Sequence, residues 1–172
     1  MKRWILLASL LLKSCGGDAV PKEGFADIKY GMSAKELKKA GFTCSSESAC
    51  SADSPTVKLS TDFSFSKPDH VTANLTNGAV SSIDLIFLMY NEDETIASYT
   101  KAYGEPTICR YQNPLAATIE RHVWSASSGA TITVSKVLDY GVFSSLGGLT
   151  QGTSSATYRD ANESKDFKSH SC

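Results

Sequence analysis

An Asn-Gly dipeptide between two alternating segments constrains the fold of this chain more than any other feature. Residues 71–75 alternate apolar and polar side chains, Asn77-Gly78 follows, and residues 80–89 start with the same alternation. Asn and Gly tolerate the positive φ angles of a two-residue turn, so this pattern strongly predicts a β-hairpin. Because residues 85–89 are nearly all apolar, we expect the far end of the second strand to be buried on both faces.

Two short helices are predicted, one on each side of the hairpin. Ser33 and Glu36 form a capping-box sequence, and Gly41 ends this first helix in the left-handed conformation. Asn91 is the expected cap of the second helix, which ends at Gly104. The buried face of the second helix is expected to carry three side chains at helical spacing: Ile96, Tyr99 and Tyr103.

The remaining periodic segments predict an antiparallel sheet. Further strands are expected at residues 57–60, 63–65, 108–111, 118–124, 130–137 and 153–158, the last of them short. The order is therefore α-β-β-β followed by α-β-β-β, which fits two diverged halves. Hairpin connections imply an α+β fold, an antiparallel sheet with the short helices packed on one face.

The N-terminus has the pattern of a secretory signal peptide over residues 1–14. Two basic residues precede an apolar run from Trp4 to Leu12, which is too short for the roughly 20 residues that span a bilayer. The segment Leu12-Lys13-Ser14-Cys15 resembles the bacterial lipobox, although Lys13 departs from its pattern. This resemblance implies acylation of Cys15, a palmitate-type lipid anchor in the cell envelope.

The lipobox resemblance also implies a location. The residue after the cysteine is Gly16 and not Asp, which implies transport to the outer membrane, with the domain facing the periplasm. The alternative is ordinary signal cleavage after Ala19, which would give a soluble periplasmic or secreted protein. One α+β domain is expected over residues 27–158, on a flexible tether of residues 15–26. Residues 159–172 are expected to form a polar tail.

The cysteine count fits an exported protein. Of five cysteines, Cys15 is lipidated or removed, which leaves Cys44, Cys50, Cys109 and Cys172. Four cysteines in an oxidising compartment favour two disulfides, with three possible connectivities. Cys44 and Cys50 enclose a polar turn that could close on itself. Cys109 would then pair with Cys172 and attach the tail.

Composition and motifs exclude several classes of ligand. The cysteine spacing lacks a CxxC pair and the histidines are scattered, so no metal site or other cofactor is expected. The net charge of −1, without a basic run or a glycine-rich phosphate loop, argues against nucleic-acid binding.

Three segments carry a resemblance to a known family. They are residues 31–42, Tyr103-Gly104-Glu105-Pro106, and Trp124 with the following strand at residues 130–134. Together they resemble small envelope lipoproteins related to the outer-membrane assembly lipoprotein BamE (SmpA/OmlA). The tandem order of helices and strands is similar to that of the beta-lactamase inhibitor protein.

The resemblance implies a non-catalytic protein-binding or assembly module. Its partners would be another envelope protein and, through acylated Cys15, the lipid bilayer. The alternative is an inhibitor or exclusion lipoprotein that blocks another envelope protein. Tyr is enriched at interfaces, although we expect most of the seven tyrosines to pack at the edge of the core: Tyr30, Tyr90, Tyr99, Tyr103, Tyr111, Tyr140 and Tyr158.

A hydrolytic enzyme is the less favoured class of protein. Glu120 and His122 share one face of a predicted strand and could supply an acid and a base, but such pairs occur in many ordinary sheets. No serine lies in a Gly-x-Ser-x-Gly context. We therefore nominate no catalytic residue.

We predict that the mature protein carries acyl chains on Cys15. Intact mass spectrometry of the chain purified from bacterial membranes should give the mass of the chain from Cys15 plus its lipid. An unmodified chain that begins at Val20 would contradict lipidation and support ordinary signal cleavage.

Overall fold

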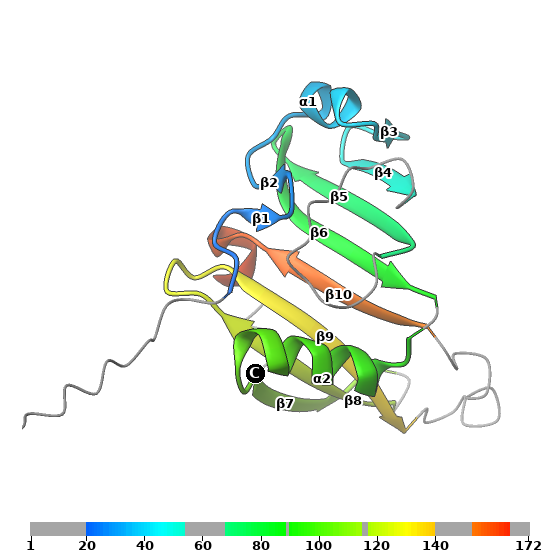
Figure 1. Ribbon diagram of the computed structural model, residues 1–172, viewed down its shortest axis with the longest axis vertical. Coiled ribbons are helices and arrows are strands. Elements are labelled where there is room, and N and C mark those ends of the chain that lie inside the picture. Colours follow the sequence, from blue (N-terminus) through cyan, green and yellow to red (C-terminus); the bar gives the residue numbers. More distant parts are fainter. Residues whose placement is uncertain (1–19, 54–67, 89, 115–116, 140–152, 166–172) are drawn as a thin grey trace, which may run out of the picture.

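The computed structural model describes residues 20–53, 68–88, 90–114, 117–139 and 153–165 (Figure 1). Several sequence predictions lie outside the described residues: the signal peptide, Cys15, the strands at 57–60 and 63–65, Tyr140 and Cys172.

Each of the two helices is followed in the chain by a set of strands. In chain order they are β1 (Gly24–Phe25), β2 (Ile28–Lys29), α1 (Ala34–Lys39), β3 (Thr43–Cys44), β4 (Ala49–Asp53), β5 (His70–Thr76), β6 (Ala79–Phe87), α2 (Glu92–Tyr103), β7 (Thr107–Gln112), β8 (Thr118–Ser125), β9 (Thr131–Asp139) and β10 (Ser154–Arg159). A helical turn follows at residues 161–165.

Strands β3 to β10 form one sheet, in the order β3-β4-β5-β6-β10-β9-β8-β7 (Figure 1). Every pair of neighbouring strands is antiparallel. The strands that follow α1 occupy one half of the sheet, those that follow α2 occupy the other, and β6 pairs with β10 at the centre. The expected α+β class with an antiparallel sheet is confirmed.

The predicted hairpin is confirmed, with one correction. Asn77 and Gly78 have φ angles of 54° and 78°, the positive values of a type I′ turn between β5 and β6. The expectation that the far end of β6 is buried on both faces is wrong. Phe87 is buried, Ile86 is only partly buried, and Leu88 is 56% exposed. The apolar run therefore contributes one face to the core.

Both predicted helix starts are confirmed. The Ser33 N–H donates to the Glu36 carboxylate at 2.8 Å, and the Glu36 N–H donates back to the Ser33 hydroxyl. Asn91 and Glu94 form a second capping box of the same kind, which was not predicted. Each box satisfies backbone N–H groups that a helix start would otherwise leave unpaired.

Helix α2 packs on β9 and β10 through an aromatic cluster. Tyr99 of α2 lies with its ring centroid 5.5 Å from that of Trp124 on β8, and its hydroxyl accepts from the Tyr158 hydroxyl at 3.2 Å. The Trp124 indole N–H donates to the Gly104 carbonyl at 2.7 Å. Trp124 thus ties the end of α2 to the sheet, which connects two of the segments that carry the family resemblance.

The last predicted strand lies at the centre of the sheet, and residues after it are packed. Ala156 and Tyr158 of β10 are fully buried between β6 and β9. The polar tail expected from residue 159 is wrong for its described part, because Ser164 in the turn at 161–165 is buried and hydrogen-bonded to Thr131. The packed chain therefore continues to residue 165.

The expected tether is also shorter than predicted. Val20 and Phe25 are buried, and the Phe25 ring lies 5.2 Å from that of Tyr158. Residues 20–26 therefore belong to the folded domain, since their apolar side chains cover the centre of the sheet. Glycine and proline content alone suggested a flexible segment there.

Candidate binding surface

Three of the four cysteines expected to form disulfides lie in the described residues, and each of them is disulfide-bonded. Cys44 and Cys50 lie opposite each other on β3 and β4 and form a disulfide. Cys109 on β7 is also disulfide-bonded, with a partner outside the described residues. Its pairing with Cys172 therefore stays a prediction, as does the lipidation of Cys15.

Among the described tyrosines, one does not pack in or against the core. Tyr99 and Tyr158 are buried in the core, and three more pack against it: Tyr30, Tyr90 and Tyr103. Tyr111 lies on β7, partly exposed and outside the core cluster. It is therefore the described tyrosine best placed to contact a partner.

Tyr111 is paired with an arginine on the sheet face opposite α2. Side chains alternate along β8, so Arg121 points to the other face from Glu120 and His122. The Arg121 guanidinium stands over the Tyr111 ring, 4.7 Å from its centroid, and its Nη2 donates to the Tyr111 hydroxyl at 2.7 Å. These two contacts hold both side chains in one arrangement.

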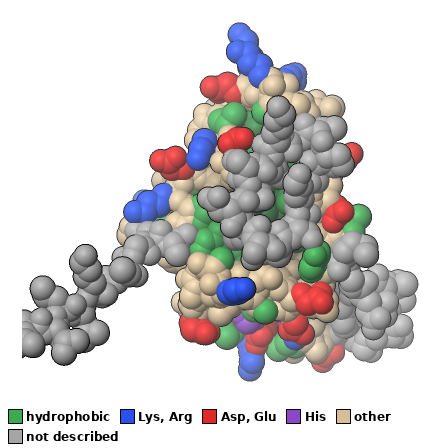
Figure 2. Space-filling model, in the orientation of Figure 1, with side chains coloured by type: hydrophobic (Ala, Val, Ile, Leu, Met, Phe, Trp, Pro, Cys, Tyr) green, Lys and Arg blue, Asp and Glu red, His purple; other side chains and the backbone are tan. Residues whose placement is uncertain are grey.

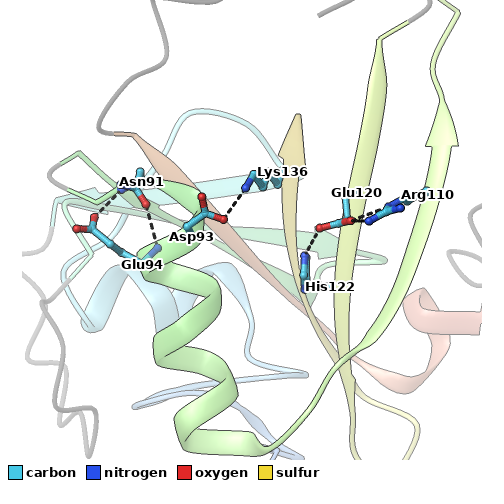
Figure 3. A network of polar contacts seen from close by, with 7 residues as sticks. All are labelled: Asn91, Asp93, Glu94, Arg110, Glu120, His122 and Lys136. Atoms are coloured by element: carbon cyan, nitrogen blue, oxygen red, sulfur yellow. Dashed lines mark hydrogen bonds and ion pairs between the residues drawn. The ribbon is translucent and has the colours of Figure 1, made fainter. Parts of the chain in front are cut away.

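On the α2 side, β7 and β8 carry a compact polar cluster (Figure 3). The Arg110 Nη2 lies 2.6 Å from the Glu120 Oε2, and the Arg110 Nε donates to the same oxygen at 2.7 Å. The His122 Nε2 is hydrogen-bonded to the other carboxylate oxygen, Oε1, at 2.9 Å. The hydrogen bonds from Arg110, and secondarily from His122, lower the pKa of Glu120 although its burial opposes this.

This geometry fits a structural role better than acid–base chemistry. Glu120 and His122 do come together, as their shared strand face predicted. However, both carboxylate oxygens of Glu120 are occupied, and its lowered pKa makes it a poor proton acceptor near neutral pH. His122 is buried against the Trp124 ring, and its Nδ1 is enclosed without a hydrogen-bond partner.

A second ion pair links the sheet to α2. The Lys136 ammonium on β9 donates to the Asp93 carboxylate, in the first turn of α2, at 2.6 Å (Figure 3). Over the face shown in Figure 2, acidic and basic side chains of the described residues are interspersed and do not form a patch of one sign. In the described part of the chain, no group of three or more His, Cys, Asp or Glu side chains could hold a metal ion. Among the same residues, no helix is long and apolar enough to cross a membrane.

Strand β7 is the long edge of the sheet. It pairs with β8 on one side, and within the described ranges no strand pairs with its other side. Ile108 on this strand is 54% exposed, one of the three most exposed large apolar side chains described. The opposite edge, β3, has two residues and is tied to β4 by the disulfide.

We call the surface along this edge the β7 margin. It comprises Ile108, Arg110 and the buried Glu120 and His122 on the α2 face of the sheet, and Tyr111 and Arg121 on the opposite face. Tyr111 was expected only as one of seven tyrosines, and the pairing of Arg110 with Glu120 was not predicted. The Arg110–Glu120 ion pair could have been predicted, because the strands expected at 108–111 and 118–124 are close enough in sequence to pair as a hairpin. Nothing in the neighbouring sequence indicates that β7 lies at the edge of the sheet.

Comparisons with protein-family models, with curated proteins and with solved structures gave no significant match.

We predict that Glu120→Gln lowers the free energy of unfolding by about 1.5–3 kcal/mol at pH 7, the usual range for hydrogen bonds to a charged group. Because folding lowers the pKa of Glu120, its contribution is present above the unfolded pKa of about 4.3 and is lost as the pH falls through the folded pKa. Urea unfolding of both proteins should therefore show a deficit at pH 7 that shrinks as the pH falls below about 4.

Exposed Glu47 provides the matched control, and Glu47→Gln should change stability by less than about 0.5 kcal/mol at either pH. A Glu120→Gln deficit of equal size at pH 7 and pH 3 would show that the carboxylate charge is not what stabilises this cluster.

Proposed function

We propose that this chain is a membrane-anchored envelope lipoprotein that acts as a non-catalytic protein-binding or assembly module, and that the β7 margin contacts its partner. The observation that carries the proposal is the fixed Tyr111–Arg121 pair on one face of β7, with exposed Ile108 on the other face of the same strand. Tyr and Arg are the residue types that most often dominate binding energy at protein interfaces.

The contacts within the β7 margin favour binding of a partner. Arg121 and Tyr111 fix each other, so less side-chain entropy is lost when a partner covers them. Arg110 is held by Glu120 on the other side of the strand. When side chains are already ordered before binding, the loss of their conformational entropy offsets less of the binding free energy.

The proposed anchor would keep this margin near the membrane. Cys15 would carry the acyl chains, and Val20 is already buried in the domain. The segment between these two residues can extend at most about 18 Å. A partner of the anchored domain would therefore itself lie close to the bilayer, in the outer membrane facing the periplasm; a soluble periplasmic or secreted protein is the alternative.

The strand order supports the proposed relation to tandem α+β envelope proteins. Each of α1 and α2 is followed by four strands, and the two sets meet at β6 and β10 in mirrored order. We infer that the chain consists of two diverged halves, as in proteins similar to BamE or to the beta-lactamase inhibitor protein. The bond from Trp124 to Gly104 gives a physical reason for finding the Tyr-Gly-x-Pro segment and the tryptophan together.

An inhibitor or exclusion lipoprotein is the second candidate. The specific observation in its favour is the sheet built from two helix-plus-strand units, the arrangement that prompted the comparison with the beta-lactamase inhibitor protein. Such a protein would block one envelope target, whereas an assembly module would join a larger complex.

Capture of envelope proteins on the purified chain tests the proposal. We expect Tyr111→Ala to reduce capture of a specific partner at least 10-fold, the effect of losing about 1.4 kcal/mol at a hot spot. Tyr111→Phe, which keeps the ring under Arg121, should retain most of the binding. Lys39→Ala, on α1 at the opposite end of the sheet, is the control for a distant surface change.

The composition of the captured material separates the two candidates. Several proteins recovered together indicate an assembly role, and a single target indicates an inhibitor. Capture unaffected by Tyr111→Ala would show that the β7 margin is not the contact surface. Steady turnover of a substrate, lost on mutation of Glu120 or His122, would overturn both candidates.

A further inference from the structure

We propose that Asn77, at the tip of the β5–β6 hairpin, is a site of spontaneous covalent modification in the folded chain. Its side-chain amide is converted through a cyclic imide to aspartate and isoaspartate, with water as the co-reactant. This inference goes beyond the proposed function and does not depend on the lipid anchor or on a partner protein.

The reaction joins the Asn77 side chain to the next backbone nitrogen. The Gly78 nitrogen attacks Cγ of Asn77, the bond from Cγ to the side-chain nitrogen breaks, and ammonia leaves with the proton that the Gly78 nitrogen has lost. Water then opens the five-membered imide at one of its two carbonyls and returns a proton to the Gly78 nitrogen. Opening at Cγ gives aspartate, whereas opening at the backbone carbonyl gives isoaspartate, in which the chain continues through Cγ. Overall, an amide and a water give a carboxylic acid and ammonia.

The hairpin tip leaves both reacting groups accessible. Asn77 and Gly78 are exposed, and a Cβ atom placed on Gly78 would meet nothing within 4 Å. In such a turn the closing hydrogen bond joins the two residues that flank the central pair, so it does not use the N–H of Gly78. Because glycine has no side chain to shield its nitrogen, the Asn77 side chain can approach it.

The hairpin tip can open without disturbing the rest of the sheet. Ring closure changes the backbone angles of Asn77, so the turn has to open locally before the reaction. The register of β5 with β6 shifts between Asn74 and Leu75, and such an irregularity disrupts the ladder at that point. Beyond the shift, two residue pairs close the tip, the outer one joining Thr76 and Ala79. Opening so short a segment costs less free energy than global unfolding.

Three other asparagines are held away from this reaction. The Asn74 Nδ2 donates to the Asp84 carboxylate at 2.7 Å. The Asn91 side chain caps α2. Asn113 is followed by Pro114, which has no N–H to lose. In each case either the side chain is already hydrogen-bonded or the following N–H is missing.

Asn162 provides the closest comparison with Asn77. Both residues line one cleft of about 320 Å³, and Asn162 is exposed as well. The residue after it is Glu163, whose N–H donates to the Asp160 carboxylate at 2.8 Å. This nitrogen is shielded by a side chain and engaged in a hydrogen bond, so Asn162 should react much more slowly than Asn77.

The product places a new negative charge beside two existing carboxylates. Asp160 and Glu163 line the same cleft as Asn77, and the described residues that line it include no Lys, Arg or His. The Glu163 Oε1 accepts from the hydroxyls of Thr76 and Ser81, each at 3.1 Å, which ties the helical turn after β10 to the hairpin. A carboxylate at position 77 repels Glu163, and isoaspartate also lengthens the two-residue turn. Modification therefore weakens this contact.

Peptide mass spectrometry of the full wild-type chain, incubated folded in mildly alkaline buffer, tests the proposal. The peptide that contains Asn77 should gain the mass that replaces an amide NH₂ with OH. This change should be about 10-fold or more faster than at Asn162, which corresponds to a barrier lower by about 1.4 kcal/mol. Fragmentation should show isoaspartate beside aspartate, as the imide route requires. Asn77→Gly removes the amide and keeps a residue that tolerates positive φ, so no such product should form at this position.

The same chain unfolded in urea, with its disulfides intact, is the reference for the folded state. If Asn77 reacts in urea and stays unchanged in the folded chain, the turn protects it and the proposal is overturned. Equal rates at Asn77 and Asn162 would overturn it as well, since the accessibility of the following nitrogen would then make no difference.

Asn77→Asp tests the consequence of the new charge. At pH 7 this variant should unfold at a lower urea concentration than the wild type. The difference should shrink below about pH 4, where protonation of the carboxylates removes the repulsion. A variant as stable as the wild type at pH 7 would overturn the consequence, because the contact of Glu163 with the hairpin would then tolerate the charge.

Discussion

The antiparallel pairing of β6 with β10 is the constraint on which the rest of the structure depends. It runs from Phe87 opposite Ser154 to Ser82 opposite Arg159 and joins the two helix-plus-strand units into one sheet. We call this pairing the β6–β10 seam. Without it, each unit would end in an unpaired apolar strand, since Ile83, Leu85 and Ala156 are fully buried there. Because β10 occupies the centre, β7 is displaced to the outer edge of its unit. The β7 margin therefore follows from the seam.

The seam also organises the packing above it. Tyr158 of β10 contacts the Phe25 ring from the N-terminal segment and the Tyr99 hydroxyl from α2, so one side chain at the centre of the sheet holds both covering elements. Helix α2 is fixed further by the bond from Trp124 to Gly104 and by the pair of Lys136 with Asp93. These contacts concentrate the aromatic side chains in the core. They leave Tyr111, on the opposite face of the sheet, as the described tyrosine outside that cluster.

Features coded by neighbouring residues could be predicted from the sequence, and features that depend on strand order could not. The Asn77-Gly78 turn, the Ser33 and Asn91 caps and the Cys44–Cys50 bond each involve residues only a few positions apart. The place of β10 depends on pairing with β6, which is far away in sequence, so the strand at 153–158 was predicted but its central position was not. Residues 20–26 read as a tether because the contact of Phe25 with Tyr158 has no local signal. The shared strand face of Glu120 and His122 was predictable, whereas the exposure of Ile108 follows from the edge position of β7.

Residue-resolved hydrogen exchange of the chain at low concentration tests the central seam most directly. The amides of β6 and β10 should exchange last, and only through global unfolding, because each strand is paired on both sides. The outward amides of β7 should exchange early by local opening. Exchange of β10 as fast as that of β7, with β6 and β9 still protected, would show that β10 does not join the two units.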